Sequence, residues 1–213
     1  MHHCNLVWVT PAAEHLIGKM ARVSNPANQD NPDVTKLIRY LIRHKHWSPF
    51  EMVNMCLEVN TTRAIAAQVL RHRSFSFQEF SQRYAPAMEL VIPELRRQDS
   101  KNRQNSTDDL DPMVIEFCTG QIEKLYRDAD AIYEYMLNHD VAKECARAVL
   151  PLNTATKLYM SGTVRSWLHY CDLRRGNGTQ KEHMQIADSA YHILKSQLPL
   201  VSSAMWPEAT GHA

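Results

Sequence analysis

The chain has 213 residues, of which 44% are hydrophobic and 22% are charged, so it suits one large domain or two small ones. Its net charge of +1 excludes the global positive field that drives non-specific binding to nucleic acid. No apolar run approaches the roughly 20 residues that span a membrane, and the N-terminus lacks the features of a signal peptide. We expect a cytoplasmic protein with no membrane or nucleic-acid partner.

The cysteines are five in number, and no two of them form a Cys-x-x-Cys pair. This pattern disfavours a disulfide framework or a zinc ribbon, and it favours buried, reduced thiols in a cytosolic protein. A His-Glu-x-x-His motif is also missing from the sequence, so we expect no metal site.

The first sixty residues predict a strand, two helices and a second strand. Residues 6–10 are β-branched and aromatic, which is typical of a strand. Residues 12–20 predict a helix, and residues 24–33 predict a loop because Asn, Pro and Asp dominate them. The apolar stripe within residues 34–44 predicts a helix. Weak alternation over residues 50–60 predicts a strand.

A helix over residues 64–70 is expected next, with Thr61 or Thr62 as its N-cap. The chain from its last turn to Tyr84 is predicted to be a loop, the kind of segment on which binding residues tend to sit. Residues 85–109 contain two prolines and then a polar run, which predicts a surface excursion.

The second half begins with a long predicted helix. Asp111 and Pro112 are typical of a helix start, and apolar residues then recur at spacings of four and three to about Asn138. This stripe predicts buried core or a subunit interface. A capping box at residues 179–182 starts a last helix. The other elements are a helix, a strand and a helix at residues 141–150, 154–160 and 164–173. This order predicts an α+β fold rather than an alternating doubly wound sheet.

The segment 68–84 holds most of the residues that could carry chemistry. It combines arginines, a histidine and a glutamate with three phenylalanines. Guanidinium groups grip phosphate or carboxylate and also stack on aromatic rings, so the mixture suits an anionic ligand with flat rings. The sequence has no glycine-rich phosphate loop, so side chains must hold any phosphate. Arg71 and Arg73 would repel each other without an anion nearby.

Other chemistries fit the residues less well. The serines near His72 lack the Gly-x-Ser-x-Gly turn of a serine hydrolase. Cys171 lies near His169, but helical residues so close in sequence point in different directions, so we expect Cys171 in the core. The alternative from a different class is a non-catalytic module that binds nucleotides or single-stranded nucleic acid through arginines and phenylalanines.

Arg71-His-Arg73, followed after seven residues by Ser81 and then by Arg83 and Tyr84, resembles the signature of the flavin-dependent thymidylate synthases. Four further segments resemble the same family, at residues 48–51, 146–153, 163–166 and 172–174. The resemblance covers roughly residues 20–200. It implies a single domain over residues 1–213, with a mostly antiparallel central sheet flanked by helices, assembled as a homotetramer whose active sites are shared among subunits.

The family reaction implied by this resemblance is the reductive methylation of dUMP to dTMP. Methylenetetrahydrofolate is the implied carbon donor, and FAD reduced by NADPH is the implied source of hydride. No enzyme cysteine attacks the uracil in this family. This agrees with the chain, where none of the cysteines lies in an evident nucleophile site.

The resemblance also assigns roles to individual residues. It implies that dUMP contacts Gln68, Arg71, Glu79, Phe80, Ser81, Gln82, Arg83, Arg147 and Arg174. It implies that FAD contacts Asn54, Arg71, His72, Arg73, Glu79, Thr163, Arg165 and His169. Arg174 is the implied catalytic residue, because a fixed cation against the uracil favours its N3-deprotonated form and activates C5. Arg147 is expected to reach the nucleotide from a neighbouring subunit.

Some positions depart from the family pattern. Met52 stands where many members have a histidine, and Thr163 and His169 stand where asparagines are frequent. Thr163 keeps a hydroxyl and His169 can still donate a hydrogen bond. Phe75 and Phe77 are expected to pack against the protein rather than to stack on a ligand ring.

Overall fold

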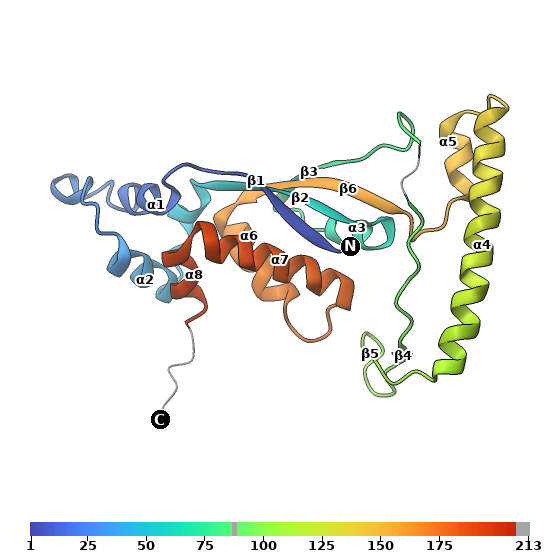
Figure 1. The fold of residues 1–213 in the computed structure, drawn as a ribbon. Helices are drawn as coiled ribbons and strands as arrows, with labels where there is room; N and C mark the ends of the chain where they lie inside the picture. The colour runs from blue at the N-terminus through green and yellow to red at the C-terminus, as the bar shows by residue number, and fades with distance from the viewer. Residues whose placement is uncertain (87–88, 208–213) are drawn as a thin grey trace.

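A computed structural model describes residues 1–86 and 89–207 as an α+β fold (Figure 1). Its centre is a four-stranded sheet in the order β1-β2-β6-β3, and each neighbouring pair is antiparallel. These strands are β1 (His3–Val9), β2 (Asn54–Thr62), β3 (Phe75–Glu79) and β6 (Ala155–Thr163). A separate small hairpin pairs β4 (Arg97–Gln98) with β5 (Ser106–Thr107). The predicted fold class is confirmed.

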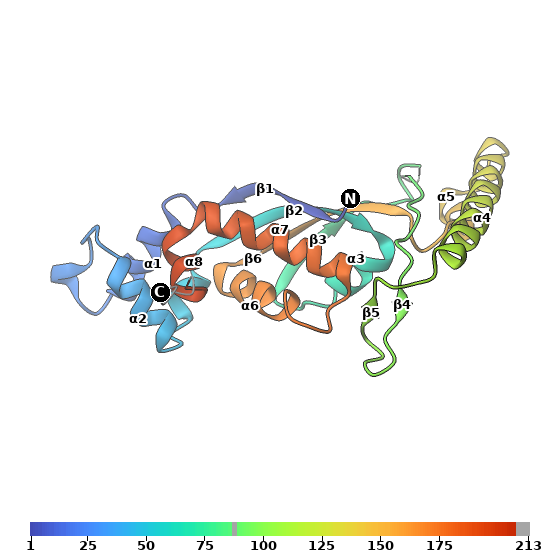
Figure 2. The same cartoon turned by 60° about the horizontal axis from the view of Figure 1, so that its bottom comes forward.

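The helices gather on one face and at the two ends of the sheet (Figures 1 and 2). The helices on the face are α6 (Val164–Arg174) and α7 (Lys181–Gln197). At one end lie α1 (Ala13–Ala21), α2 (Thr35–Arg43), the short 3₁₀ helices η1 (Pro26–Asn28) and η2 (Ser48–Glu51), and α8 (Pro199–Met205), which packs against α2. Towards the other end lie α3 (Arg63–Val69), α4 (Pro112–Asn138), α5 (Lys143–Ala146) and η3 (Arg147–Val149).

The core fills the space between the sheet and α6 with α7. Trp167 of α6 is fully buried, and its indole Nε1 donates a hydrogen bond to the carbonyl of Met55 on β2 at 3.0 Å. Cys171 is also fully buried, as predicted. Phe75 of β3 packs edge-on against Trp167 with 4.8 Å between ring centroids. The expectation that Phe75 packs against the protein is therefore confirmed.

Gly162 is required where β3 meets β6. It lies opposite Phe75 in the register, and a Cβ atom at this position would come within 2.4 Å of the Phe75 ring. The ring can lie flat over the strand because Gly162 has no side chain. β6 extends beyond the strand predicted at residues 154–160, because residues 161–162 still pair with both β2 and β3.

Two other boundaries differ from the sequence prediction. The predicted loop beyond residue 70 contains β3, in which Phe75 and Phe77 alternate with polar residues and turn inward together with period two. The predicted strand over residues 50–60 starts late, because Ser48–Glu51 form η2 and β2 begins at Asn54.

Three further predictions differ from the structure: a capping box, a helix and the burial of one cysteine. The capping box at residues 179–182 does not form: Gln180 is the N-cap of α7, and the Glu182 carboxylate faces Arg96 instead. The predicted helix over residues 141–150 is split between α5 and η3. All five cysteines are free, but Cys145 is exposed rather than buried.

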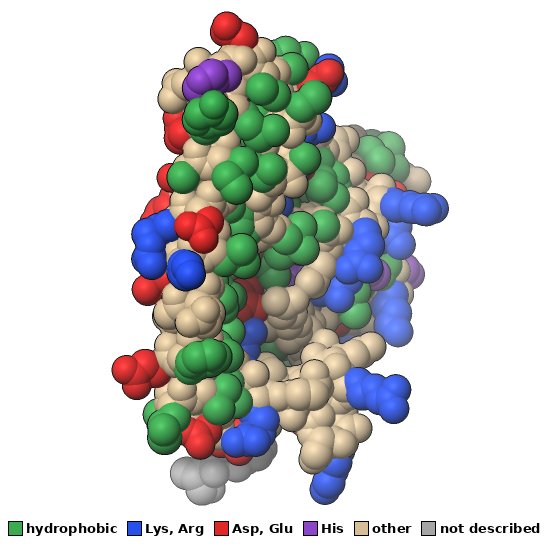
Figure 3. Space-filling model, turned by 90° about the vertical axis from the view of Figure 1, so that its right-hand side faces the viewer, with side chains coloured by type: hydrophobic (Ala, Val, Ile, Leu, Met, Phe, Trp, Pro, Cys, Tyr) green, Lys and Arg blue, Asp and Glu red, His purple; other side chains and the backbone are tan. Residues whose placement is uncertain are grey.

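The long helix α4 begins as predicted and leaves much of its apolar surface uncovered. The Asp111 carboxylate accepts a hydrogen bond from the Met113 amide at 2.8 Å, and Pro112 occupies the first turn. Ala129 is buried, but the exposed fractions of Leu125 and Ile132 are 60% and 51%. Figure 3 shows hydrophobic side chains along the face of the molecule that α4 lines. Apolar surface of this kind marks an interaction site. No helix in the described ranges has the length and apolar character needed to cross a membrane.

Replacing Gly162 by alanine tests the packing of β3 on β6. We expect Gly162→Ala to lower the free energy of unfolding by about 1–3 kcal/mol, because the Phe75 ring must move away from the new methyl group. Chemical denaturation measures the change. Gly120→Ala is the matched control, since a Cβ there meets no atom within 4 Å and alanine favours a helix by about 0.5–1 kcal/mol. Equal stability of the two variants contradicts the packing argument.

Candidate active site

A hydrogen bond joins His72, just beyond α3, to Arg174 at the end of α6. The Nε–H of Arg174 donates to Nε2 of His72 at 2.9 Å. A histidine nitrogen accepts a hydrogen bond only while it carries no proton, so His72 must be neutral here. Burial, and then the positive charges of Arg174 and Arg71, lower the pKa of His72 to about 4. The imidazole is therefore neutral near pH 7 and fixes the direction of the Arg174 guanidinium.

Two buried rings lie behind His72. Its ring meets the rings of Tyr170 and His183 edge-on, at centroid distances of 5.0 Å and 5.9 Å. The phenol oxygen of Tyr170 and Nε2 of His183 form a hydrogen bond of 3.1 Å. Burial, and then the nearby charge of Arg174, lower the pKa of His183 to about 3.

His183 is a site residue that sequence reasoning missed. Its helical spacing carried the signal, because His183 shares the buried face of α7 with Ile186, Ala187 and Ala190.

Two guanidinium groups beside His72 are available to a ligand. The side chains of Arg71 and Arg73 are exposed, and with the residues that the structure describes they form neither a hydrogen bond nor an ion pair. Gln68 lies on the same side, where its Nε2 donates to Oε1 of Gln180 at 2.6 Å. The structure thus brings Gln68, Arg71 and Arg174 around His72, and we call these four residues the His72 group.

A second group of predicted residues follows β3. At about 3.3 Å per residue, β3 carries the chain roughly 13 Å from Phe75 to Glu79. The Glu79 carboxylate accepts a hydrogen bond from Thr156 Oγ1 at 3.0 Å and lies 3.5 Å from Arg63 Nη1. Glu79, Phe80 and Ser81 line a pocket of about 430 Å³ together with Lys157 and Tyr159 of β6.

The end of this second group contacts α5. Arg83 Nη2 lies 3.1 Å from Glu144 Oε2, and Lys143 Nζ donates to the carbonyl of Tyr84 at 3.1 Å. Gln82 is buried. The side chain of Arg147 has no hydrogen-bond or ion-pair partner among the described residues. Both ribbon views show α5 and η3 well apart from the end of α6 (Figures 1 and 2), so one chain does not bring Arg147 to Arg174.

The third group lies at the start of α6. Asn54 of β2 and Thr163 of β6 face each other in the register, and the Thr163 hydroxyl caps α6 by accepting from the Ser166 amide at 3.2 Å. Arg165 forms an ion pair with Glu51. The 11 residues of α6 place Thr163 about 16 Å along the helix axis from Arg174.

Two contacts connect the third group to its neighbours. Ser166 Oγ donates to the carbonyl of Ser74 at 3.3 Å, so Arg73 lies between the His72 group and the third group. The ring of His169 meets Trp47 edge-on at 5.4 Å. Met52, just after η2, is 55% exposed. The predicted flavin residues thus lie near α6, except Glu79, which lies at the far end of β3.

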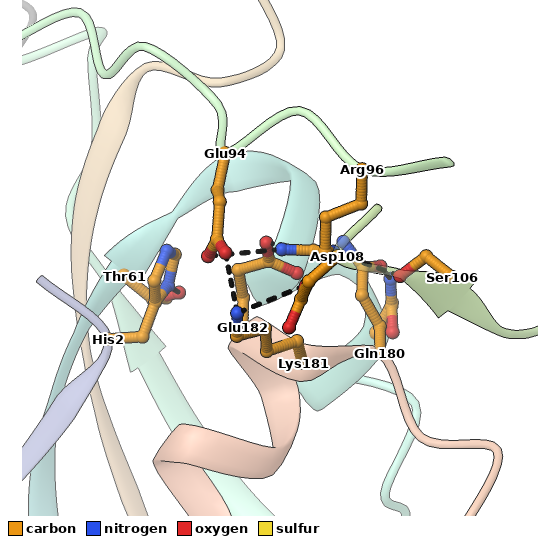
Figure 4. Close-up of polar contacts among 10 residues, drawn as sticks. His2, Thr61, Glu94, Arg96, Ser106, Asp108, Gln180, Lys181 and Glu182 are labelled. Carbon is orange, nitrogen blue, oxygen red and sulfur yellow. Dashed lines mark hydrogen bonds and ion pairs between the residues drawn. The ribbon is translucent and has the colours of Figure 1, made fainter. Parts of the chain in front are cut away.

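An ion-pair network attaches the segment before β4 to the start of α7 (Figure 4). Arg96 Nη2 lies 2.8 Å from Glu182 Oε1, and their side chains are only 10% and 15% exposed. Arg96 also donates from Nε to Ser106 Oγ at 2.9 Å. Lys181 joins Glu94 to Asp108 with N–O distances of 2.5 Å and 3.5 Å. The predicted surface excursion is therefore tied to the helix that carries His183.

Comparisons with known proteins agree with the resemblance noted in the sequence. The family model described as "Thymidylate synthase complementing protein" matches residues 5–200. A "Flavin-dependent thymidylate synthase" from Synechocystis sp. is 53% identical over 192 residues, covering 90% of this chain and 89% of the relative. A "Probable flavin-dependent thymidylate synthase" from Paramecium bursaria Chlorella virus 1 is 51% identical over 195 residues, covering 91% of this chain and 90% of the relative.

A solved structure resembles this chain along nearly its whole length. It is the UMP/dUMP methylase PolB from Streptomyces cacaoi, bound with 5-Br dUMP. The TM-score is 0.83 at 26% sequence identity, and the match covers 96% of this chain and 94% of the other.

Removing Arg96 tests whether the network supports the start of α7. We expect Arg96→Leu to lower the free energy of unfolding by about 2–4 kcal/mol, because it leaves the Glu182 carboxylate buried without its cation. Arg97→Leu is the matched control. The side chains of Arg97 and its partner Asp109 are 50% and 70% exposed, so we expect the free energy of unfolding to fall by less than about 1 kcal/mol. Similar small losses in urea denaturation for both variants rule out a supporting role.

Proposed function

This chain belongs to the flavin-dependent thymidylate synthase family, and from that membership we propose that it converts dUMP to dTMP with FAD as its cofactor. The observation that carries the proposal is the family match across residues 5–200. That range contains the His72 group, in which the fixed guanidinium of Arg174 and the Arg71 side chain, unpaired among the described residues, are available to an anionic ligand. Methylenetetrahydrofolate is the proposed carbon donor and NADPH the proposed reductant.

The residues along α6 fit a bound FAD. Its diphosphate needs cations, and Arg71 and Arg73 offer guanidinium groups that no described residue engages. Asn54, Glu79 and Thr163 supply polar groups. The remaining proposed contacts are His72, Arg165 and His169. When bound and reduced, the cofactor supplies the hydride that completes the methyl group.

Arg174 acts on the uracil ring in this proposal. Its Nε–H is occupied by His72, so the two terminal amino groups remain free to donate to the base. A fixed positive charge at the ring favours loss of the N3 proton and stabilises the anion that results. The added electron density makes C5 the nucleophile that bonds to the methylene carbon of the folate, and no cysteine of the chain is needed.

The second group is proposed to hold the rest of the nucleotide. The segment from Glu79 through Gln82, which includes Ser81, offers amide, hydroxyl and carboxylate groups to the ribose and base. Gln68 of the His72 group offers a further amide. Arg83 is proposed to bind the phosphate. Its ion pair with Glu144 is more than half exposed, and an exposed pair contributes so little that a phosphate dianion can replace it.

Each site is proposed to draw residues from more than one chain of a homotetramer. Arg147 directly follows α5 and Arg174 ends α6. These two helices lie well apart in both ribbon views (Figures 1 and 2), yet both arginines are proposed to contact dUMP. The exposed apolar side chains of α4 supply a surface that a second copy can cover. Both parts of the chain then serve one site, so we propose that residues 1–213 work as one domain. The five free cysteines suit the reducing cytoplasm.

The role of Arg174 is tested by removing its guanidinium. We expect Arg174→Ala to lower dTMP formation at least about 100-fold, the scale for losing a group that stabilises developing charge, while flavin absorbance per protein stays unchanged. Arg175→Ala is the control, because Arg175 Nε faces Asp188 at 2.7 Å and its guanidinium lies over Tyr191. Its turnover should stay near wild type. Full turnover in Arg174→Ala removes that residue from its role, and a wild-type protein that cannot bind FAD refutes the proposed function.

Site sharing is tested by mixing two inactive variants. Arg147→Ala and Arg174→Ala chains carrying different tags are co-expressed, and the mixed tetramers are purified through both tags. If each site takes these arginines from different subunits, about a quarter of the sites regain both, and a corresponding share of activity returns. Activity no higher than that of either variant alone shows that one subunit supplies both arginines.

A further inference from the structure

We propose that His183 is a positioning residue: with Tyr170 it forms a buried wall that holds the His72 imidazole where its Nε2 accepts from Arg174. This inference rests on the proposed role of Arg174. It deepens that role by naming what lies behind the guanidinium, since His183 touches neither the nucleotide nor the flavin in this account.

The geometry of the wall carries the proposal. The His72 ring has Tyr170 and His183 edge-on to it, with interplanar angles of 80° and 85°. Tyr170 and His183 are 2% and 1% exposed, and the 3.1 Å hydrogen bond between them fixes their relative orientation. Tyr170 is also packed edge-on against Trp167 in the core. The wall is therefore anchored on two helices, and His72 packs against both.

Stability alone does not explain a histidine at position 183. Its Nδ1 is buried without a hydrogen-bond partner among the described residues. An unpaired buried polar atom costs about as much as an ordinary hydrogen bond contributes, or more, and an apolar side chain would avoid that cost. Residues that lower stability in this way are retained at functional sites. The one polar contact that His183 makes in the described structure is the bond to Tyr170.

The wall also controls the protonation of His72. The groups that face the His72 ring are Arg71 from its own turn, Arg174 and Tyr170 from α6, and His183 from α7. The positive charges of the two arginines disfavour a protonated His72, and the wall excludes the water that would stabilise its charge. Opening the wall lets water reach the ring, so the pKa of His72 rises from about 4 towards its usual range near 6.5. A protonated His72 cannot accept from Arg174, and the guanidinium loses its fixed direction.

The test compares variants with wild type across pH. His183→Ala removes the ring and lets water reach His72. We expect its kcat/KM for dUMP, divided by that of wild type at the same pH, to fall several-fold between pH 8 and pH 5.5, with about tenfold as the limit for a His72 pKa of its usual value near 6.5. His183→Gln replaces Nε2 by an amide and should stay within a few-fold of wild type. His192→Ala, the same substitution at an exposed position of α7, should give a constant ratio.

A purely structural role makes a different prediction. It lowers thermal stability or flavin content but leaves the activity ratio independent of pH. His183→Val leaves a smaller cavity and serves if His183→Ala does not fold; it should show the same acid loss. A constant ratio in the folded wall variants overturns the inference while wild type still makes dTMP. A wild-type protein that forms no dTMP instead refutes the proposed function.

Discussion

The hydrogen bond from Arg174 to His72 is the constraint on which the rest of the candidate site depends. A guanidinium group can only donate, so its neighbour must be an acceptor, and an imidazole accepts only when neutral. Burial and two nearby arginines keep His72 in that state. The bond occupies Nε of Arg174 and leaves the outer face of the fork for a ligand. Because α6 supplies Arg174 and α7 supplies His183, the packing of these helices sets the chemistry of the site.

The sheet determines how far apart the other groups lie. β3 starts beside the His72 group and ends at Glu79. Its neighbour β6 runs antiparallel to β3 and ends at Thr163, the N-cap residue of α6. The glycine at position 162 allows Phe75 to pin β3 onto β6. The length of β3 therefore separates the His72 group from Arg83, the proposed phosphate contact. Arg147 follows α5 as the first residue of η3, and α5 lies beside α4 beyond the end of this sheet (Figure 1).

Local signals in the sequence were sufficient to predict much of the fold. Asp111 and Pro112 marked the start of α4, and the inward stripe of α6 placed Cys171 in the core. Side-chain contacts between distant segments were not predictable in the same way. Glu182 had the spacing of a capping box, but Arg96 arrives from a different part of the chain and takes its carboxylate.

The site was predictable in its residues and not in its arrangement. The signature around residues 71–84 identified the candidate ligands, because the family pattern preserves their identities. The bond between His72 and Arg174, and the wall formed by Tyr170 and His183, depend on how α3, α6 and α7 pack. Nothing in the spacing of these residues along the chain encodes that contact.

The protonation state of His72 is the most direct measure of this account. Nitrogen NMR of the protein labelled with ¹⁵N-histidine, with His72→Gln used to assign the signal, reports the imidazole across a pH titration. We predict that His72 remains neutral with its proton on Nδ1 down to at least about pH 5, as expected for a pKa of about 4. A titration midpoint near the ordinary value of about 6.5 contradicts the neutral acceptor and, with it, the fixed position of Arg174.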